Sequence, residues 1–233
     1  MRGFAERADV EVVDRFLEER SRRLEAEPVR RGAKALLGYS DITTLLLWQL
    51  RCAGLVGFHA PMFDCDGALG DDEFEALLCA LQGKDAGRVW SGQARGGGSA
   101  DGWLLGGSLT LLAASLGTPW EPDTRGAILL FEDVCEKPYV LDRLLQQLRA
   151  AGKLDTLAGV GVGHLRDCVD PKRETPRAED VVLDALAPLE VPIVLGLPFG
   201  HGRPNLTWPF GVRSALDGER GRLEILEAGV ERR

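Results

Sequence analysis

Three histidines, His59, His164 and His201, are the residues of this sequence whose ordinary pKa suits a general base near neutral pH. Each follows an apolar run that predicts a β-strand. His201 stands between two glycines just past the run 191–197, and open α/β sheets bind their ligands at such carboxyl ends of strands. Position alone leaves a structural role open for each histidine, and their wide spacing disfavours a metal site.

Ser40 is the candidate nucleophile, because it lies where a predicted strand, 33–39, passes directly into a predicted helix, 41–52. Such a turn exposes the hydroxyl and directs the first backbone N–H groups of the helix at a developing oxyanion. The G-x-S-x-G pattern is incomplete, since Ile42 stands where the second glycine would be. A helix N-cap is therefore the alternative role for Ser40.

Glu132 and Asp133 follow the predicted strand 126–131, so an acid stands at a third strand end. An acid in this position can orient a histidine and stabilise its charged form, as the third member of a catalytic triad does. The chain has 36 acidic residues, so a solvated strand end is the alternative.

The elements that must position these side chains alternate along the chain. Short apolar runs predict the strands, and helices have apolar residues three and four positions apart. The predicted strands are 33–39, 55–59, 126–131, 157–163 and 191–197, and the predicted helices are 41–52, 71–81, 139–152 and 179–186. This alternation predicts an α/β fold with some parallel pairing.

Two helices have a clear apolar stripe. In 71–81 the stripe follows three acids at the positive end of the helix dipole, and in 139–152 it is made of leucines. The predicted stripes are Phe74, Leu77, Leu78 and Leu81 in the first helix and Leu141, Leu144, Leu145 and Leu148 in the second.

Glycine and serine cluster between residues 83 and 107, around Gly96 to Ser99. This composition predicts a linker or loop over a site, with a domain boundary beside it. We expect an N-terminal α/β domain at 1–85 that carries the nucleophile, a Gly-rich linker at 86–105, and a C-terminal domain at 106–233 that carries the acid and the histidine. A phosphate loop is disfavoured because no Lys-Ser/Thr pair follows the glycines.

Composition excludes several classes of function. The chain has 233 residues, 45% hydrophobic and 27% charged, as in globular proteins, and its net charge of −8 disfavours binding to nucleic acid or an anionic membrane. No run has the length of a membrane span, and the first 20 residues lack the apolar core of a signal peptide. The cysteines form no C-x-x-C pair, which predicts a reduced, cytoplasmic protein. They are Cys52, Cys65, Cys79, Cys135 and Cys168.

Five short blocks follow one another from about Lys34 to the C-terminus. They are GYSDIT at 38–43, HAPM at 59–62, GGSL at 106–109 with LGTP at 116–119, FED at 131–133 with EKPY at 136–139 and Asp142-Arg143, and GH at 200–201 with NLT at 205–207 and PFG at 209–211. Together they resemble the LD-carboxypeptidase family of serine peptidases, whose relatives include the microcin C self-immunity peptidases. One block alone would be weak, whereas five in order are specific.

The resemblance implies that Ser40 is the nucleophile, His201 its base and Glu132 the acid that orients the histidine. The backbone N–H of Asp41 would be an oxyanion donor. The implied fold is a truncated flavodoxin-like N-terminal domain and a mixed α/β C-terminal domain of LD-carboxypeptidase type, with the site between them. The order Ser, Glu, His is also that of α/β-hydrolases.

The resemblance further implies hydrolysis of an L,D-peptide bond through an acyl-enzyme, releasing a terminal D-amino acid, typically D-alanine, from muropeptide tetrapeptides. It implies no metal or organic cofactor. The expected partners are a muropeptide or other small peptide and, as in relatives, a second copy in a homodimer. A basic side chain should bind the free carboxylate of the substrate.

Members of the family carry opening strands and an Arg-Gly-Gly-Tyr-Gly loop before the serine, which this sequence does not show before Ser40. Residues 1–31 are instead charged, with Val13, Phe16, Leu17 and Leu24 at helical spacing. The N-terminal sheet is therefore expected to be shortened, with an open edge.

Two alternatives to the carboxypeptidase remain open at this point. One is an impaired relative that binds a peptide or a partner chain. The other is a microcin-immunity-like hydrolase, for which Trp90 and Trp103 could stack on a base.

Overall fold

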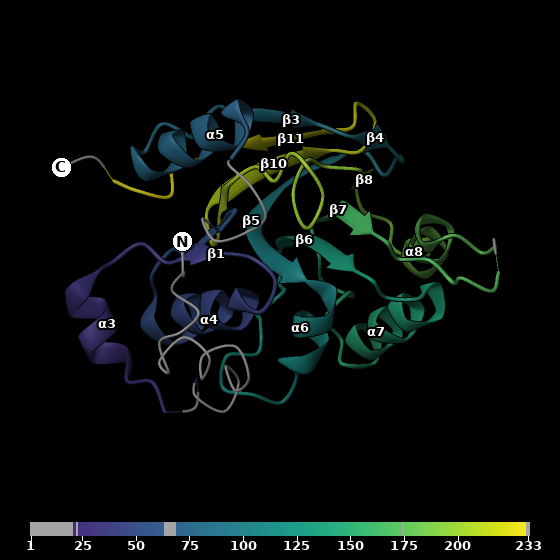
Figure 1. Ribbon diagram of the computed structural model, residues 1–233, viewed down its shortest axis with the longest axis horizontal. Coiled ribbons are helices and arrows are strands. Elements are labelled where there is room, and N and C mark those ends of the chain that lie inside the picture. Colours follow the sequence, from purple (N-terminus) through teal and green to yellow (C-terminus); the bar gives the residue numbers. More distant parts are fainter. Residues whose placement is uncertain (1–20, 22, 63–68, 174, 232–233) are drawn as a thin grey trace, which may run out of the picture.

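The computed structural model describes residues 21, 23–62, 69–173 and 175–231 (Figure 1). The predicted N-terminal helical spacing lies mostly outside the described residues. None of the described helices is long and apolar enough to span a bilayer. The helices are α3 (Ala26–Gly32), α4 (Ile42–Trp48), the π-helical η2 (Gln49–Ala53), α5 (Asp71–Leu81), α6 (Leu109–Ala114), α7 (Pro138–Ala150) and α8 (Ala178–Leu186). The strands are β1 (Leu37–Gly38), β2 (Phe58–His59), β3 (Val89–Ser91), β4 (Gln93–Ala94), β5 (Ser99–Ser108), β6 (Ala127–Val134), β7 (Gly159–Arg166), β8 (Ile193–Leu195), β9 (Trp208–Pro209), β10 (Arg213–Asp217) and β11 (Arg222–Ile225).

A small sheet carries the start of the described chain. Its order is β1-β2-β9, with β1 parallel to β2 and β2 antiparallel to β9. The strands predicted at 33–39 and 55–59 therefore exist, but only two residues of each pair in this sheet. The helix predicted at 41–52 is present as α4 continued by η2.

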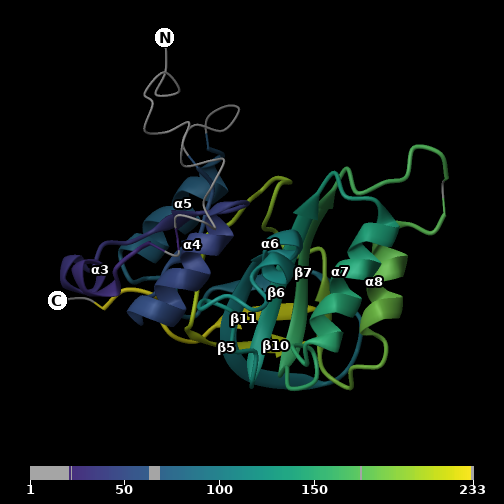
Figure 2. The ribbon, with the colours of Figure 1, turned by 90° about the horizontal axis from the view of Figure 1, so that it is seen from below.

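A larger sheet contains eight strands in the order β3-β11-β10-β5-β6-β7-β8-β4. Its middle strands, β5 to β8, are parallel and consecutive, and the outer strands pair antiparallel. Because right-handed crossovers between strands in sequential order put every connecting helix on one face, α6, α7 and α8 lie together; α7 and α8 pack along the same side of β7 (Figure 2). The predicted α/β fold is confirmed.

The prediction that residues 86–105 form a Gly-rich linker is wrong in one respect. This segment is part of the larger sheet, because β3, β4 and most of β5 lie within it. Strands β3 and β4 form the two edges of the larger sheet although only Gly92 separates them, so the sheet curls round until its edges meet. Glycine is needed at this closure: a Cβ on Gly92 would lie 2.4 Å from the Leu195 carbonyl oxygen, and one on Gly97 would lie 2.1 Å from that of Val191. The domain division at 1–85 and 106–233 stays a prediction.

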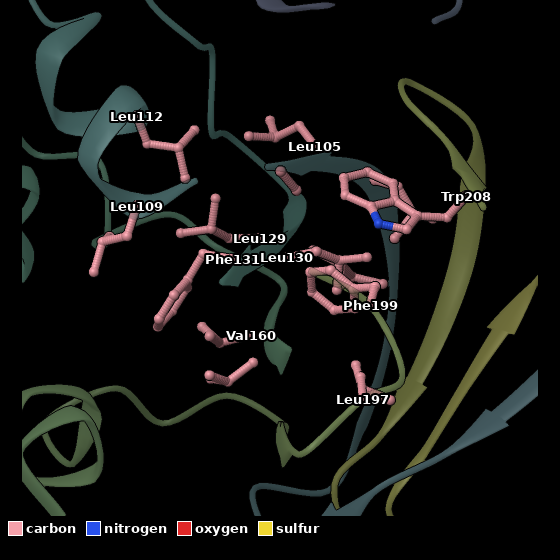
Figure 3. Close-up of a cluster of buried hydrophobic side chains, with 14 of the residues drawn as sticks. Leu105, Leu109, Leu112, Leu129, Leu130, Phe131, Val160, Leu197, Phe199 and Trp208 are labelled. Carbon is pink, nitrogen blue, oxygen red and sulfur yellow. The ribbon is translucent and has the colours of Figure 1, made fainter. Parts of the chain in front are cut away.

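The core lies on both faces of the parallel strands, and helices cover one of these faces. Strand β6 is buried on both faces, as expected of a central parallel strand. The side chains labelled in Figure 3 belong to this core and are all fully or almost fully buried; they are Leu105, Leu109, Leu112, Leu129, Leu130, Phe131, Val160, Leu197, Phe199 and Trp208. Helix α7 begins at Pro138, a residue preorganised for the first helical turn, and buries Leu141, Leu145 and Leu148 of the predicted stripe.

Helix α5 has the predicted bounds but not the predicted buried face. Its buried residues are Glu73, Ala76, Leu77 and Ala80. Phe74, Leu78 and Leu81 of the predicted stripe are 50%, 38% and 40% exposed. A stripe prediction follows the large apolar side chains, whereas this helix packs closely through small residues and one carboxylate.

Leu77 and Leu78 allow a matched test of this packing. We expect Leu77→Ala to lower the free energy of unfolding by about 2–5 kcal/mol, because Leu77 is 2% exposed in a cluster with Phe58 and Ala60. Leu78→Ala should cost less than about 1 kcal/mol. Urea denaturation of both variants measures the difference, and equal losses would contradict the assigned face of α5.

Candidate active site

Three segments that are far apart in the sequence meet at one place in the structure. Ser40 follows β1, Glu132 lies near the end of β6, and His201 lies in the loop after β8. The Nε2 atom of His201 lies 3.2 Å from Ser40 Oγ, and its Nδ1 atom lies 2.7 Å from Glu132 Oε2. The structure therefore brings together the hydroxyl, imidazole and carboxylate that the sequence singles out.

The turn at Ser40 has the strained backbone of a nucleophile elbow. Ser40 has φ 56°, in the left-handed region that residues with a Cβ rarely adopt. The turn is tight enough to require glycine at position 38, because a Cβ there would lie 2.8 Å from the side chain of Ile42. The N-cap of α4 is Asp41, and no side chain caps it. The hydroxyl of Ser40 thus faces His201 instead of capping the helix, its alternative role.

A link between the two sheets fixes α4 beside the acid. The backbone N–H of Ser108, at the end of β5, donates to Thr43 Oγ1 at 3.1 Å. Gly107 leaves room for Thr43, since its Cβ would lie 2.4 Å from the same oxygen. Ser108 is paired with Glu132 in the parallel ladder of β5 and β6. Helix α4, which follows the turn at Ser40, is therefore placed one strand away from Glu132.

Glu132 is a fully buried carboxylate. Its Oε2 atom lies 2.7 Å from His201 Nδ1 and accepts a 3.2 Å hydrogen bond from the backbone N–H of His201, while Oε1 has no partner among the described residues. An acceptor at Nδ1 favours the tautomer with its proton there, which leaves Nε2 free to accept from Ser40. The side chain of His201 is 17% exposed, and the ring of Tyr39 packs edge-on against it at 4.8 Å.

Two further groups near the candidate site, the backbone N–H of Asp41 and the carboxylate of Asp133, have separate roles. Among the described residues, no hydrogen-bond acceptor is found for the backbone N–H of Asp41, whereas Ile42 and Thr43 donate to the preceding turn. Asp133 points to α6, where its Oδ2 atom accepts from the backbone and hydroxyl of Thr110. Asp133 is thus a helix anchor, and Glu132 is the acid next to the histidine.

His59 is enclosed by aromatic rings. It stacks on Trp208 with ring centroids 5.2 Å apart and meets Phe199 edge-on, and neither ring nitrogen has a partner among the described residues. Burial, and secondarily the neighbouring His201 and His164, lower the pKa of His59 to about 3. Within the described residues, His59 makes ring contacts and no side-chain hydrogen bond, so it is placed for packing and not as the base for Ser40.

His164 supports the loop of His201. Its Nδ1 atom accepts from the backbone N–H of Gly202 at 3.1 Å, and burial lowers its pKa. This contact requires glycine at position 202, because a Cβ there would lie 2.5 Å from the imidazole of His164. Of the three histidines, His201 is the one placed between a hydroxyl and a carboxylate.

Two further residues also hold the loop: Asn205, which lies in the same sequence block as His201, and Glu73, which the sequence does not mark for this site. Asn205 Oδ1 accepts from the backbone N–H of Gly200, and Glu73 Oε1 accepts from that of Asn205. The start of 71–81 shows Glu73 only as one of three acids at a helix N-terminus. Its place three residues after Gly70, as in a capping box, is the sequence signal that could have distinguished it.

The remaining sequence candidates do not join the site. Trp90 is buried in β3, and Trp103 lies in β5 with the guanidinium of Arg213 5.1 Å from its ring centroid. Trp103 is five residues before the Ser108 end of β5, or roughly 16 Å at the rise of a strand. Among the described residues, no group of three His, Cys, Asp or Glu side chains is arranged to hold a metal ion.

Comparison with known proteins places this site in a family. Residues 101–216 match the model of the LD-carboxypeptidase C-terminal domain. The chain belongs to the LD-carboxypeptidase family. The probable murein peptide carboxypeptidase of Bacillus subtilis is 36% identical over 209 residues, which cover 87% of this chain and 65% of that protein. The chain spans between 63% and 65% of the length of the first three curated carboxypeptidases it matches.

Solved structures of LD-carboxypeptidase relatives have the same fold. The muramoyltetrapeptide carboxypeptidase of Oxalobacter formigenes superposes with a TM-score of 0.79 at 29% identity, covering 88% of this chain and 73% of that one. The microcin C7 self-immunity protein MccF in complex with aspartyl sulfamoyl adenosine also has a TM-score of 0.79, at 26% identity, with coverage of 91% and 72%. The expected likeness to both branches of the family is confirmed.

The strain at Ser40 can be measured without reference to activity. Glycine adopts a positive φ freely, whereas alanine does not. We expect Ser40→Gly to be more stable than Ser40→Ala by about 1 kcal/mol, because both remove the hydroxyl and only glycine relieves the backbone. Urea denaturation compares the two variants; an alanine variant at least as stable as the glycine variant would contradict the strained turn.

The buried His59 predicts a pH dependence of stability. The unfolded chain takes up a proton on His59 near its ordinary pKa of 6.5, and the folded chain resists it until about pH 3. The free energy of unfolding should therefore be highest above this window and fall as the pH drops through it, by at most about 1.4 kcal/mol per pH unit. His59→Phe, which keeps the stack on Trp208, should remove this component. Denaturation curves across the window that have the same pH slope in both proteins would contradict it.

Proposed function

We propose that this chain is a serine-type LD-carboxypeptidase that releases a terminal D-amino acid, D-alanine, from muropeptide tetrapeptides. The observation that carries the proposal is the continuous path from Ser40 Oγ through the imidazole of His201 to the buried carboxylate of Glu132. Membership of the LD-carboxypeptidase family and the relatives named murein peptide carboxypeptidase support the choice of substrate.

The proposed reaction begins when Ser40 Oγ attacks the carbonyl carbon of the L,D-peptide bond. Nε2 of His201 takes the hydroxyl proton, and the N–H of Asp41 donates to the oxyanion. Collapse of the tetrahedral intermediate breaks the C–N bond, and the leaving amine of D-alanine takes the proton from His201. A water molecule, deprotonated by His201, then attacks the acyl-enzyme; the bond between the acyl carbon and Ser40 Oγ breaks, and His201 gives the proton to Ser40.

Glu132 is proposed to orient His201 and to stabilise its charged form. Both functions need a carboxylate that stays in place, and Glu132 is held inside the sheet with no exposed surface. In a dry environment the attraction between a carboxylate and an imidazolium is much stronger than in water. The imidazolium that forms during each proton transfer is thus the species that Glu132 favours.

A second candidate uses the same residues on a different acyl compound. The similarity to MccF, whose structure holds aspartyl sulfamoyl adenosine, favours a hydrolase of acyl-nucleotide analogues. The positions of Trp90 and Trp103 do not support it, because Trp90 is buried in β3 and Trp103 lies five residues before the Ser108 end of β5. The muropeptide therefore stays the first choice.

The setting of the reaction is also a proposal. We propose a cytoplasmic protein, which the free thiols of Cys52, Cys79, Cys135 and Cys168 support. A homodimer, and the absence of nucleic-acid and membrane partners, stay predictions.

Removing the Ser40 hydroxyl tests the proposed function. We expect Ser40→Ala to lower the rate of D-alanine release from a muropeptide tetrapeptide by about 10⁴- to 10⁶-fold, since it removes the nucleophile. Mass spectrometry of the product follows the reaction, and Ser99→Ala, on the exposed start of β5, is the control.

A fluorophosphonate reagent, which phosphonylates activated serines with loss of fluoride, supplies the independent readout. The wild-type chain should be labelled at Ser40. Unchanged D-alanine release by Ser40→Ala would refute the assigned nucleophile. A wild-type chain that is neither labelled nor active would instead favour an impaired, peptide-binding relative.

A further inference from the structure

A buried carboxylate outside the Ser40, His201 and Glu132 triad holds the loop that carries the histidine. Glu73 lies in the first turn of α5 and is 3% exposed. Its Oε1 atom accepts a 2.8 Å hydrogen bond from the backbone N–H of Asn205, and its Oε2 atom accepts one of 2.8 Å from Gly70. The guanidinium of Arg203 adds a longer ion pair, 3.5 Å from Oε2.

Asn205 continues this contact towards the imidazole. Its backbone is held by Glu73, and its side-chain Oδ1 atom accepts a 2.9 Å hydrogen bond from the backbone N–H of Gly200. Gly200 precedes His201 and packs against Glu132, where a Cβ would lie 2.7 Å from the carboxylate. Two hydrogen bonds thus connect a carboxylate in α5 to the residue next to the base.

The loop needs such anchors because residues 200–207 form neither helix nor strand. Its backbone groups are fixed one by one: Gly202 by His164, the carbonyl of His201 by Arg166 at 2.9 Å, and Gly200 and Asn205 by the path from Glu73. Glu73 differs from the other anchors in origin, since it comes from the segment between Ser40 and the larger sheet.

We infer that Glu73 is a positioning residue for His201 and that it acts through Asn205. By fixing Asn205 to α5, Glu73 sets the distance at which the imidazole meets Ser40. The catalytic chemistry on which this inference rests is the proposed function, but the geometry concerns only the activated serine. Displacement of a reacting group by about 1 Å is enough to slow a reaction about 100-fold.

The test compares Glu73→Ala with a matched control on the same turn of the helix. Asp72→Ala removes an equal charge from an exposed position of α5. We expect Glu73→Ala to lower both kcat for D-alanine release and the rate constant for labelling of Ser40 by a fluorophosphonate by about 100-fold, with KM little changed. Asp72→Ala should behave as wild type.

Rescue separates positioning from a general loss of structure. Glu73→Gln keeps an oxygen that can accept from the N–H of Asn205, so it should regain most of the labelling rate. Asn205→Ala leaves the cap between Glu73 and Gly70 intact and removes only the acceptor for Gly200. It should slow labelling as Glu73→Ala does, and Asn205→Asp should restore it. The Asn205 variants decide the question if Glu73→Ala does not fold.

Several results would overturn the inference. They are a folded Glu73→Ala or Asn205→Ala that is labelled as fast as wild type, a rise in KM with unchanged kcat, or an equal loss in Asp72→Ala. A wild-type chain that is labelled at Ser40 but releases no D-alanine refutes the proposed substrate alone, since the labelling rates still test the positioning. A wild-type chain that is neither labelled at Ser40 nor active on the tetrapeptide removes both proposals.

Discussion

The arrangement of this site depends on the partners that stabilise the charge of one buried carboxylate. Glu132 has no exposed surface, and the hydrogen bonds it makes within the described part of the chain are to the ring and the backbone N–H of a single residue, His201. A buried charge that loses its partners costs several kcal/mol. The loop of His201 therefore cannot leave Glu132 without a large penalty, and the position of the imidazole follows from the position of β6.

The scaffold carries this constraint across two sheets. The carboxyl ends of the parallel strands lie on the same side of the larger sheet, and Glu132 lies there, near the end of β6. The hydrogen bond from Ser108 to Thr43 holds α4 against the end of β5. Ser40 starts the turn that leads into α4, so the same link sets the distance from the hydroxyl to the carboxylate. Glu73 adds a second connection between the part of the chain that carries Ser40 and the loop after β8. Family membership supports the chemistry proposed for the three groups, whereas these connections explain why the groups meet.

Local patterns predicted much of this from the sequence, and long-range contacts account for what they missed. Helix α5 begins and ends where its acids and apolar residues indicate, yet its buried face was predicted wrongly because Ala76 and Ala80 pack more closely than Phe74. The Gly-rich segment has the composition of a linker, but its glycines permit backbone contacts with residues about 95 positions later, as between Gly97 and Val191. Ser40, Glu132 and His201 could be chosen because ordered blocks resemble a family. The capping position of Glu73 could have marked it as a helix cap, but its contact with the loop of His201 could not be predicted, because its partner, Asn205, lies 132 residues away.

The separation between Ser40 and His201, 161 residues, also has a consequence for the protein while it is being made. A ribosome adds residues in order, so the hydroxyl emerges long before its base, and strands β10 and β11, which pair with β5 and β3, emerge later still. Contacts of such high sequence separation form late and slowly. A nascent chain accordingly carries Ser40 without its imidazole partner for a long part of its synthesis, and the contact between Ser40 and His201 forms only after the segment that contains β8 and the loop behind it has emerged.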